Sequence, residues 1–248
     1  MNNSTTADSA HGMNQLRPLN IAVMALVATI AGFGGAAIWN LTGLGSQTTR
    51  NHIMADPEII PDAMQRLQER ETGERLARLG DSLTAPYPGA VLGNPEGAVT
   101  LVEFSDYACG FCRTAVADVE ALIAANDDLK VVIREYPILS EQSAAAARMA
   151  LAAADQGKFA AFHKAMYAKE RPTNEAIEAA AREAGLDLER AMADIRSGKY
   201  EAELMRNHSL AGDLGVDGTP AWVVGNRTIA GAVGEERLAE AIAEARAT

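Results

Sequence analysis

The sequence predicts an α/β domain that carries an all-helical insertion and is preceded by an apolar N-terminal helix and a charged helical stalk. Three observations lead to this prediction: an uncharged apolar segment at 19–44, two β-rich runs that enclose a helical pattern between 99 and 136, and an Ala-rich helical stretch before two further short strands. The chain has 248 residues, which suits one large domain or one domain plus an appendage, and its 48% hydrophobic and 22% charged residues are typical of a globular protein.

The charge and the cysteine content exclude several classes of protein. The net charge is −11 and no stretch is rich in Lys or Arg, so binding to the phosphates of DNA or RNA is not expected. The only cysteines are Cys109 and Cys112, which excludes a disulfide-rich secreted scaffold and a zinc site built from four thiolates. We expect neither a resident metal nor an organic cofactor.

The N-terminal region predicts a membrane anchor. The 32 residues between Arg17 and Arg50 carry no formal charge, and 19–39 is long and apolar enough to cross the hydrocarbon core of a bilayer. The alternative for 19–44 is a cleaved signal segment, although the apolar part of such a segment is usually shorter. Residues 1–18 are polar and predict a disordered cytoplasmic tail, because an uncleaved anchor exports the chain that follows it.

Residues 50–83 are the predicted stalk. Apolar residues recur there at intervals of mostly three and four among many charges, which is typical of an amphipathic helix or of two helices that meet near Gly73. We weigh two roles equally: a solvated spacer, and an oligomerisation segment that buries its apolar stripe against copies of itself. The prolines and glycines at 84–95 predict a linker before the folded domain.

The α/β pattern begins at Val99. Residues 99–104 and 129–136 are β-rich apolar runs, of which the first is the expected central strand. The segment that starts at Cys109 has apolar residues at helical spacing. Strand, helix and strand in this order predict two parallel strands joined by a crossover helix.

The helical insertion is predicted at about 140–214, where four or five Ala-rich helices fit between glycine and proline breaks. The aromatic residues and His163 within 159–167 have helical spacing and are expected in its core. Two short strands around a turn at 225–226 and a last helix at about 235–245 complete the domain. The economical interpretation is one domain with an insertion rather than two domains in series.

Cys109 and Cys112 form a CxxC pair at the point where a strand gives way to a helix. A thiol there lies near the unpaired N–H groups at the helix start, which favour its thiolate, and Cys112 shares its helical face. A reversible disulfide is therefore expected. The other interpretations are a chance spacing, a zinc half-site, for which paired histidines are lacking, and a structural disulfide, whose short loop would stabilise little.

Two further features point to the same site. Glu103 is the one charged residue in the strand 99–104, on the face opposite its apolar neighbours Val102 and Phe104, and a buried carboxylate there would relay protons to the second sulfur. The alternative is an exposed strand edge without a role. Pro220 opens a later strand, and a cis bond before it would leave backbone groups free to pair with an extended substrate.

The runs FSDYACGFC at 104–112 and LGVDGTPAWV at 214–223, with a helical block between them, resemble the DsbA-type thiol:disulfide oxidoreductases. The resemblance covers about 88–246 and implies a thioredoxin-like fold with an inserted helical domain. It implies that Cys109 is the nucleophile, Cys112 the resolving cysteine and Glu103 the buried acid. Substrate binding would fall to Gly110, Phe111, Thr219 and Pro220, the last as a cis-proline.

The sequence departs from the best-known oxidases of this family. It has Gly110-Phe111 where they have Pro-His. It also has Thr219 where they have Val, and in this position it is more like the isomerase branch. The stalk resembles the N-terminal segment of the ScsC-like branch, some of whose members oligomerise through it. Oxidase and isomerase or reductase directions therefore both stay open, and the membrane redox partner is either a DsbB-like oxidase or a DsbD-like reductant.

The resemblance also implies substrates and a location. The substrates would be unfolded or misoxidised exported proteins, met by a periplasmic domain on a single-pass anchor in the bacterial inner membrane, or by a free periplasmic protein if 19–44 is cleaved. Two rival hypotheses use the same scaffold. One is a metal-handling protein that holds Cu(I) between the Cys109 and Cys112 thiolates, and the other is a passive peptide-binding adaptor.

Overall fold

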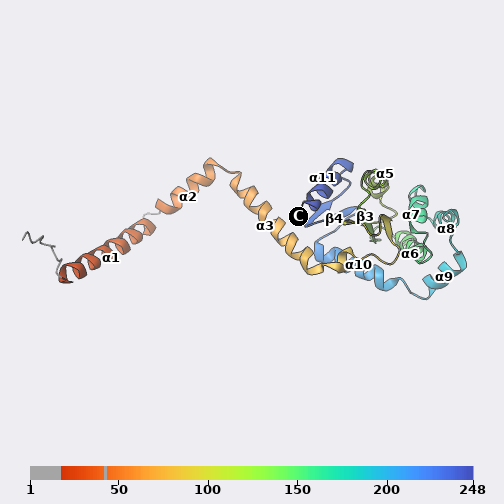
Figure 1. Ribbon diagram of the computed structural model, residues 1–248, viewed down its shortest axis with the longest axis horizontal. Helices are drawn as coiled ribbons and strands as arrows, with labels where there is room; N and C mark the ends of the chain where they lie inside the picture. The colour runs from red at the N-terminus through yellow and green to blue at the C-terminus, as the bar shows by residue number, and fades with distance from the viewer. Residues whose placement is uncertain (1–17, 42–43, 248) are drawn as a thin grey trace, which may run out of the picture. The chain divides into compact units, whose positions relative to one another are not determined.

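The computed structural model describes residues 18–41 and 44–247 (Figure 1). The predicted tail at 1–18 lies outside these residues except for its last position. The chain divides into two units, Met1–Met64 and Gln65–Thr248. The first unit contains the helices α1 (Pro18–Leu41) and α2 (Leu44–Ala55) and the first turns of α3 (Ile59–Leu79).

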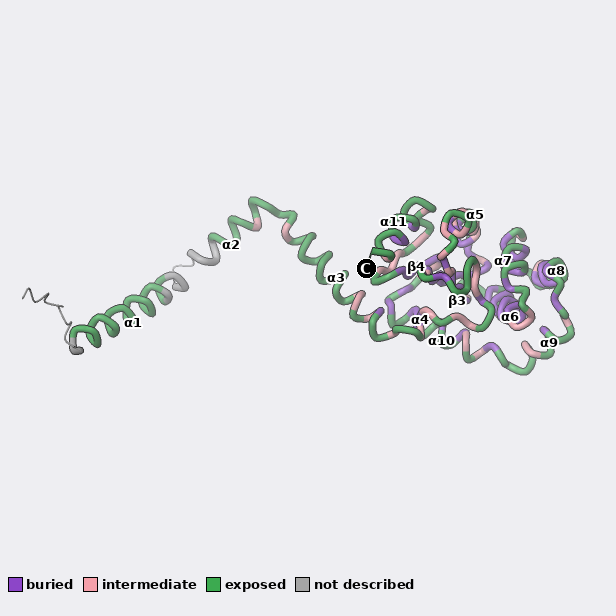
Figure 2. The backbone as a smooth tube through the Cα atoms, in the orientation of Figure 1, coloured by how far each residue is buried: buried purple, intermediate pink, exposed green. Residues whose placement is uncertain are grey.

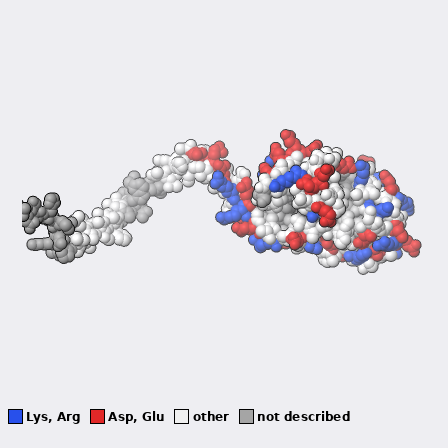
Figure 3. All heavy atoms as spheres, in the orientation of Figure 1, with Lys and Arg blue, Asp and Glu red and all other residues white. Residues whose placement is uncertain are grey.

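Helix α1 covers most of the predicted apolar segment at 19–44. Its large apolar side chains are exposed (Figure 2), namely Ile21, Val23, Met24, Leu26, Val27, Ile30, Phe33 and Ile38. No charged side chain occurs along α1, whereas charges of both signs cover the visible face of the second unit (Figure 3). Among the residues that the structure describes, no helix combines the length and the apolar character that a membrane crossing requires. The transmembrane helix predicted from the sequence is thus not found there.

The described part of the second unit contains one five-stranded sheet in the order β1-β3-β2-β4-β5. The strands are β1 (Val91–Gly93), β2 (Val99–Ser105), β3 (Leu129–Glu135), β4 (Ala221–Val224) and β5 (Arg227–Ala230). The pair β2 and β3 is parallel and the other pairs are antiparallel. The predicted central strand, the crossover and the β4–β5 hairpin are confirmed. The predicted linker at 84–95 is wrong in part, because β1 lies within it.

Helices cover both faces of this sheet. Helices α5 (Gly110–Ala125) and α11 (Glu235–Arg246) lie on one face, and α10 (Glu201–Leu214) and α4 (Asp81–Thr84) lie on the other (Figure 1). Alternate residues of β2 enter the two core clusters: Leu101 packs on the α5 side, whereas Val102 and Phe104 pack on the α10 side. This period of two places Glu103 on the α5 side, under the helix that carries both cysteines.

Four helices form a block beside the sheet: α6 (Glu141–Asp155), α7 (Phe159–Tyr167), α8 (Asn174–Glu183) and α9 (Leu188–Arg196). Helix α6 is buried along most of its length, since its many alanines let α7, α8 and α9 pack closely around it. The prediction of four or five helices at 140–214 is confirmed. The last of them, α10, covers the sheet instead of belonging to the block.

The end of the predicted stalk is part of the second unit. Helix α3 continues through Gly73, and the break comes at Gly80, whose φ of 45° suits a residue without a Cβ. Leu76 and Leu83 are buried in the core cluster on the α10 side of the sheet. The solvated spacer is therefore wrong for this end of the stalk. The sequence could not show this, because an apolar stripe one turn long does not reveal which surface it packs against.

Candidate functional site

Cys109 is the N-cap residue of α5. Its Sγ accepts a hydrogen bond from the backbone N–H of Cys112 at 3.3 Å, and its thiol donates to the carbonyl oxygen of Thr219 at 3.2 Å. Both cysteines are free thiols and nearly buried, with 5% of Cys109 and 0% of Cys112 exposed. The CxxC spacing thus places one sulfur against the helix N-terminus and the other within the first turn.

The turn between β2 and α5 is fixed by Asp106. One carboxylate oxygen of Asp106 accepts from the N–H of Ala108 at 2.8 Å, and the other accepts from the N–H groups of Ile138 and Leu139. These bonds hold the start of α5 against the loop after β3. Each of the three N–H groups has the buried Asp106 carboxylate as its acceptor. This residue was not predicted, because an aspartate in a turn has no distinctive signal in the sequence.

The loop before β4 faces the cysteines. The peptide bond between Thr219 and Pro220 is cis, as the family resemblance implies, and β4 pairs with β2 so that Ala221 lies opposite Phe104. This register holds the Thr219 carbonyl at the end of β2 from which α5 begins. The other residues expected to bind substrate, Gly110 and Phe111, lie at the exposed start of α5, where the Phe111 side chain is 69% exposed.

Glu103 is buried, with 3% of its surface exposed. Its Oε1 accepts a hydrogen bond from Ser105 Oγ at 2.8 Å, and that hydroxyl also contacts Tyr167 Oη at 2.7 Å. Burial raises the pKa of Glu103 to about 7, against a smaller lowering by Ser105. Burial, followed by the charge of Glu103, raises the pKa of the Cys112 thiol well above its usual range. Burial therefore favours the neutral form of both the carboxyl and the thiol.

A second cluster of buried polar side chains lies under α5, and the sequence did not predict it. Tyr107 Oη donates to Glu135 Oε1 at 3.1 Å and lies 3.1 Å from His163 Nδ1. Burial raises the pKa of Glu135 well above its usual range and lowers the pKa of His163 to about 4, so burial favours the neutral form of both side chains. His163 is buried, as expected for core, yet it reaches the active-site region.

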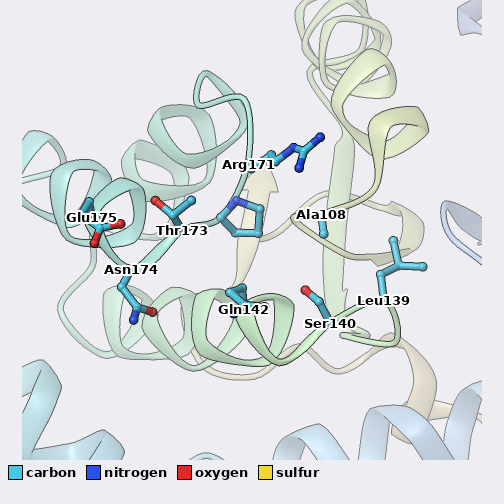
Figure 4. Close-up of a pocket in the computed structure, with 9 residues that line it drawn as sticks. Ala108, Leu139, Ser140, Gln142, Arg171, Thr173, Asn174 and Glu175 are labelled. Carbon is cyan, nitrogen blue, oxygen red and sulfur yellow. The ribbon is translucent and has the colours of Figure 1, made fainter.

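A cavity of about 710 Å³ has Ala108, the residue that precedes Cys109 in the chain, in its wall (Figure 4). Leu139, Ser140 and Gln142 at the start of α6 and residues 171–175 before and within α8 form the rest of its wall. In Figure 4, Arg171 lies toward Ala108 and Glu175 lies at the opposite end. The cavity is thus polar and asymmetric in charge.

Within the described ranges, 18–41 and 44–247, no three His, Cys, Asp or Glu side chains are arranged to hold a metal ion. The two thiols of the CxxC pair are the only cysteine donors in the sequence.

A CxxC pair at a helix N-terminus, set against a cis-proline loop and above a buried acid, defines the class of thiol:disulfide oxidoreductases. Residues 100–243 match the DSBA-like thioredoxin domain, which is more than half of the chain, and the chain belongs to this family. The chain has a thioredoxin-like α/β fold, so the resemblance seen in the two sequence runs is confirmed.

Three solved structures are similar over two thirds or more of this chain. A thioredoxin-like oxidoreductase from Silicibacter pomeroyi is 42% identical with a TM-score of 0.65, covering 68% of this chain and 98% of that one. The thiol-disulfide exchange protein alpha-DsbA2 from Wolbachia pipientis is 28% identical with a TM-score of 0.66, covering 72% and 97%. A linker-deletion variant of Proteus mirabilis ScsC is 25% identical with a TM-score of 0.64, covering 82% and 93%. The predicted similarity to ScsC is confirmed.

Curated relatives are longer than this chain. The Na⁺/H⁺ antiporter NhaA of Herminiimonas arsenicoxydans is 29% identical over 218 residues, which make up 85% of this chain but 35% of that protein. The chain spans about a third or less of the length of the curated relatives it matches.

Proposed function

We propose that the protein exchanges disulfides with cysteines of exported proteins through Cys109 and Cys112. The observation that carries this proposal is the position of Cys109 Sγ, which caps α5, accepts the N–H of Cys112 and faces the Thr219 carbonyl. N–H groups at a helix start stabilise negative charge on a sulfur that leaves a mixed disulfide. The exposed Gly110 and Phe111 give a substrate access from the side of the helix start.

In the oxidising direction the pair begins as a disulfide. A substrate thiolate attacks Cys109 Sγ, the bond to Cys112 breaks, and Cys112 leaves as a thiolate that takes the proton of the Glu103 carboxylic acid. A second substrate thiolate then attacks the substrate sulfur of the mixed disulfide and releases Cys109 as a thiolate. The substrate loses two electrons and gains a disulfide, and the CxxC pair gains two electrons.

In the reducing or isomerising direction the same residues act in reverse. Cys109 thiolate attacks a substrate disulfide and releases one substrate thiolate. Cys112 then gives its proton to the Glu103 carboxylate and attacks Cys109 Sγ, which releases the substrate if it does not rearrange first. The reduction potential of the pair decides the direction: roughly −120 mV favours an oxidase and roughly −270 mV favours a reductase.

The cavity beside Ala108 suits the polypeptide that flanks a substrate cysteine. Leu139 offers an exposed apolar contact, and the Arg171 guanidinium on the Ala108 side of the cavity would pair with an acidic side chain of the substrate. Storage of Cu(I) is less favoured, because a thiolate ligand must form at Cys112, where burial and the Glu103 charge keep the proton on the sulfur.

The nucleophile is tested by Cys109→Ser, which we expect to abolish insulin reduction and dithiol oxidation. Its matched control is Cys112→Ser, which keeps the attacking sulfur and should accumulate a mixed disulfide with a cysteine-containing peptide, detected by mass spectrometry. Exchange retained by Cys109→Ser, or no mixed disulfide with Cys112→Ser, would contradict the mechanism. Tight stoichiometric Cu(I) binding with negligible exchange by the wild-type chain would favour copper storage instead.

We also propose that the domain works in the bacterial periplasm, next to a DsbB-like or DsbD-like membrane partner. The support for attachment to the membrane is the sequence between Arg17 and Arg50, which has no charge, and the exposed apolar side chains of α1. Extraction of membranes at alkaline pH tests the attachment: the full chain should stay in the pellet and a chain that begins at residue 45 should not. Full release of both would contradict it.

A further inference from the structure

A second cavity, of about 300 Å³, lies in the helical block between α6, α8 and α9. Asn174, the first residue of α8, lines this cavity and also the larger one that has Ala108 in its wall. In Figure 4, Asn174 lies at the end of the larger cavity that is away from Ala108. The two cavities thus adjoin and form one groove. Its two parts are the inner cavity, which Ala108 lines, and the outer pocket, which α9 lines.

Two side chains near the cysteines hold the walls of the inner cavity in place. Asp106 accepts hydrogen bonds from the N–H of Ala108 and from the loop that leads to α6. On the other side, the Arg113 guanidinium of α5 donates to the carbonyl oxygen of Glu170 at 2.6 Å, directly before the lining residue Arg171. Each wall is therefore positioned relative to the CxxC helix. A groove that is fixed in this way costs a bound peptide little reorganisation.

The outer pocket is apolar in its interior. Its apolar lining residues come from all three helices and are Ala145, Met149, Ile177, Met192 and Ile195. Met149 and Ile177 are buried, whereas Met192 is 40% exposed. An apolar cavity of about 150 Å³ is enough to hold a benzene molecule, so this pocket has room for a leucine, methionine or phenylalanine side chain. Flexible methionine side chains adapt to apolar groups of different shape.

The charged residues that line the outer pocket are already paired. Arg148 of α6 donates to both carboxylate oxygens of Glu201, at 2.6 and 3.1 Å. Glu178 of α8 accepts from Arg182 at 2.9 Å. A charged group of a substrate would have to compete with these partners, whereas an apolar side chain would leave both pairs intact. The pocket therefore favours an apolar occupant.

We propose that the outer pocket binds a large apolar side chain of the substrate polypeptide that is joined to Cys109. The inference rests on the proposed disulfide exchange and adds the class of substrate: an extended segment with an apolar residue at some distance from its cysteine. The occupant follows from continuity, because a substrate in a mixed disulfide with Cys109 lies where the groove begins. Folded proteins bury most large apolar side chains, so the pocket selects unfolded segments.

The length of the groove limits the spacing between cysteine and apolar residue. Gln142 lines the inner cavity and Met149 lines the outer pocket, and both lie on α6. The seven residues from one to the other correspond to a rise of about 10 Å along the helix. About three residues of an extended peptide span this distance. The apolar residue therefore lies at least about three positions from the substrate cysteine.

The test uses unstructured peptides that contain a single cysteine. In each member of the series one phenylalanine is placed at a different position before or after the cysteine, and the reference peptide has serine at all of these positions. The measured quantity is the second-order rate constant with which the peptide thiol attacks the Cys109–Cys112 disulfide of the full chain. A preference for phenylalanine at a particular spacing reports the pocket.

Two variants block the outer pocket and a third is the control. Met192→Glu places a charge in the pocket, and Ala145→Leu fills it. Met205→Glu introduces the same charge at a methionine of α10 that is 66% exposed and lines neither cavity. The rate with dithiothreitol, which is too small to reach the pocket, shows whether each variant keeps a working CxxC pair.

We expect the wild-type chain to react at least about tenfold faster with the best phenylalanine peptide than with the serine peptide, because a large apolar side chain leaves water. Met192→Glu and Ala145→Leu should remove this preference, and Met205→Glu should keep it. All four proteins should react equally with dithiothreitol. Equal rates for phenylalanine and serine peptides at every spacing, or an unchanged preference in both pocket variants, would overturn the proposal.

Failure of the proposed function is recognised separately, as an absence of exchange by the wild-type chain. The pocket is then still measured by fluorescence anisotropy of a labelled phenylalanine peptide in which serine replaces the cysteine, and the same variants should weaken or keep its binding. A lower mass of Met192→Glu, but not of Met205→Glu, in light scattering would show that a second copy of this chain occupies the pocket. That outcome would also overturn the proposal.

Discussion

At the scale of the residue, Glu103 is an acid whose neutral form suits the fold and whose charged form the proposed exchange uses. Its neighbours in the sheet are apolar, because Ile133 and Trp222 lie opposite it on β3 and β4. A single hydroxyl, that of Ser105, donates a hydrogen bond to one carboxyl oxygen of Glu103. The strand therefore holds an acid whose charge is unfavourable in the folded state, which is what keeps a transferable proton on it near pH 7.

Replacing this acid by its neutral isostere should change stability in a pH-dependent way. The raised pKa of Glu103 means that the folded state prefers the protonated form, so the stability it contributes is intact below 4.5, its ordinary value, and is lost as pH rises through about 7. We expect Glu103→Gln to raise the free energy of unfolding by about 3 kcal/mol at pH 8 and by little at pH 4. Urea unfolding at both pH values measures the difference.

The control for this comparison is Glu236→Gln, which removes an exposed carboxyl on α11. It should change the free energy of unfolding by less than about 0.5 kcal/mol at either pH. If Glu103→Gln gave the same difference at pH 4 and pH 8, ionisation of this residue would not limit stability and the argument for a buried proton donor would fail.

The sequence reveals the residues of the site whose neighbours along the chain define them. Cys109 and Cys112 identify each other by spacing, and Glu103 stands out as a charge within an apolar strand. Tyr107, Glu135 and His163 do not stand out, because the contacts of Tyr107 with the other two join residues 28 and 56 positions apart. No local sequence pattern shows that α7 places a histidine in contact with Tyr107 under α5.

At the scale of the element, Arg134 fixes the end of the stalk to the sheet. Its guanidinium is fully buried on β3 and donates to the carbonyls of Ser82, Leu83 and Ala85 and to Glu203 Oε1. These carbonyls lie at the end of α4, where no following helical turn supplies N–H donors for them. One side chain thus satisfies a helix terminus, and an arginine in a strand pattern gives no hint of this use.

Arg134→Met should destabilise the domain strongly, since it leaves several buried carbonyls and the Glu203 carboxylate without a donor. We expect a loss of about 3–5 kcal/mol in the free energy of unfolding, measured by urea denaturation at pH 7. Arg237→Met, at an exposed position on α11, is the control and should cost less than about 1 kcal/mol. A small effect of Arg134→Met would mean that water replaces the guanidinium.

The elements that were predicted correctly are long or strongly patterned. Strands β2 and β3 are continuous apolar runs, and the glycines that end helices α6, α8 and α9 have positive φ, a conformation that favours glycine. Strand β1 is three residues long and lies between Gly89 and Pro95, so turn signals hide it. The place of α10 on the sheet also follows from tertiary packing and not from its own sequence pattern.

At the scale of the whole molecule, α3 presents an apolar stripe that a single chain leaves uncovered. Ile60, Met64 and Leu67 follow one another at intervals of four and three, and they are 49%, 58% and 44% exposed. This spacing places them on one face of the helix, where a second copy of the same helix would bury all three. We propose that the protein self-associates through this stripe, independently of the CxxC pair.

Charged substitutions within the stripe should make the protein monomeric. We expect the double variant Ile60→Glu and Leu67→Glu to elute with the mass of one chain in size-exclusion chromatography with light scattering, because like charges would face each other across the contact. Gln65→Glu, on another face of α3, adds a carboxylate without touching the stripe and should keep the wild-type mass. Exchange activity toward a small dithiol should be equal in all three proteins, since each keeps its own CxxC pair. A wild-type chain that is already monomeric across micromolar concentrations would show that α3 is a spacer, and the stripe would then need another partner.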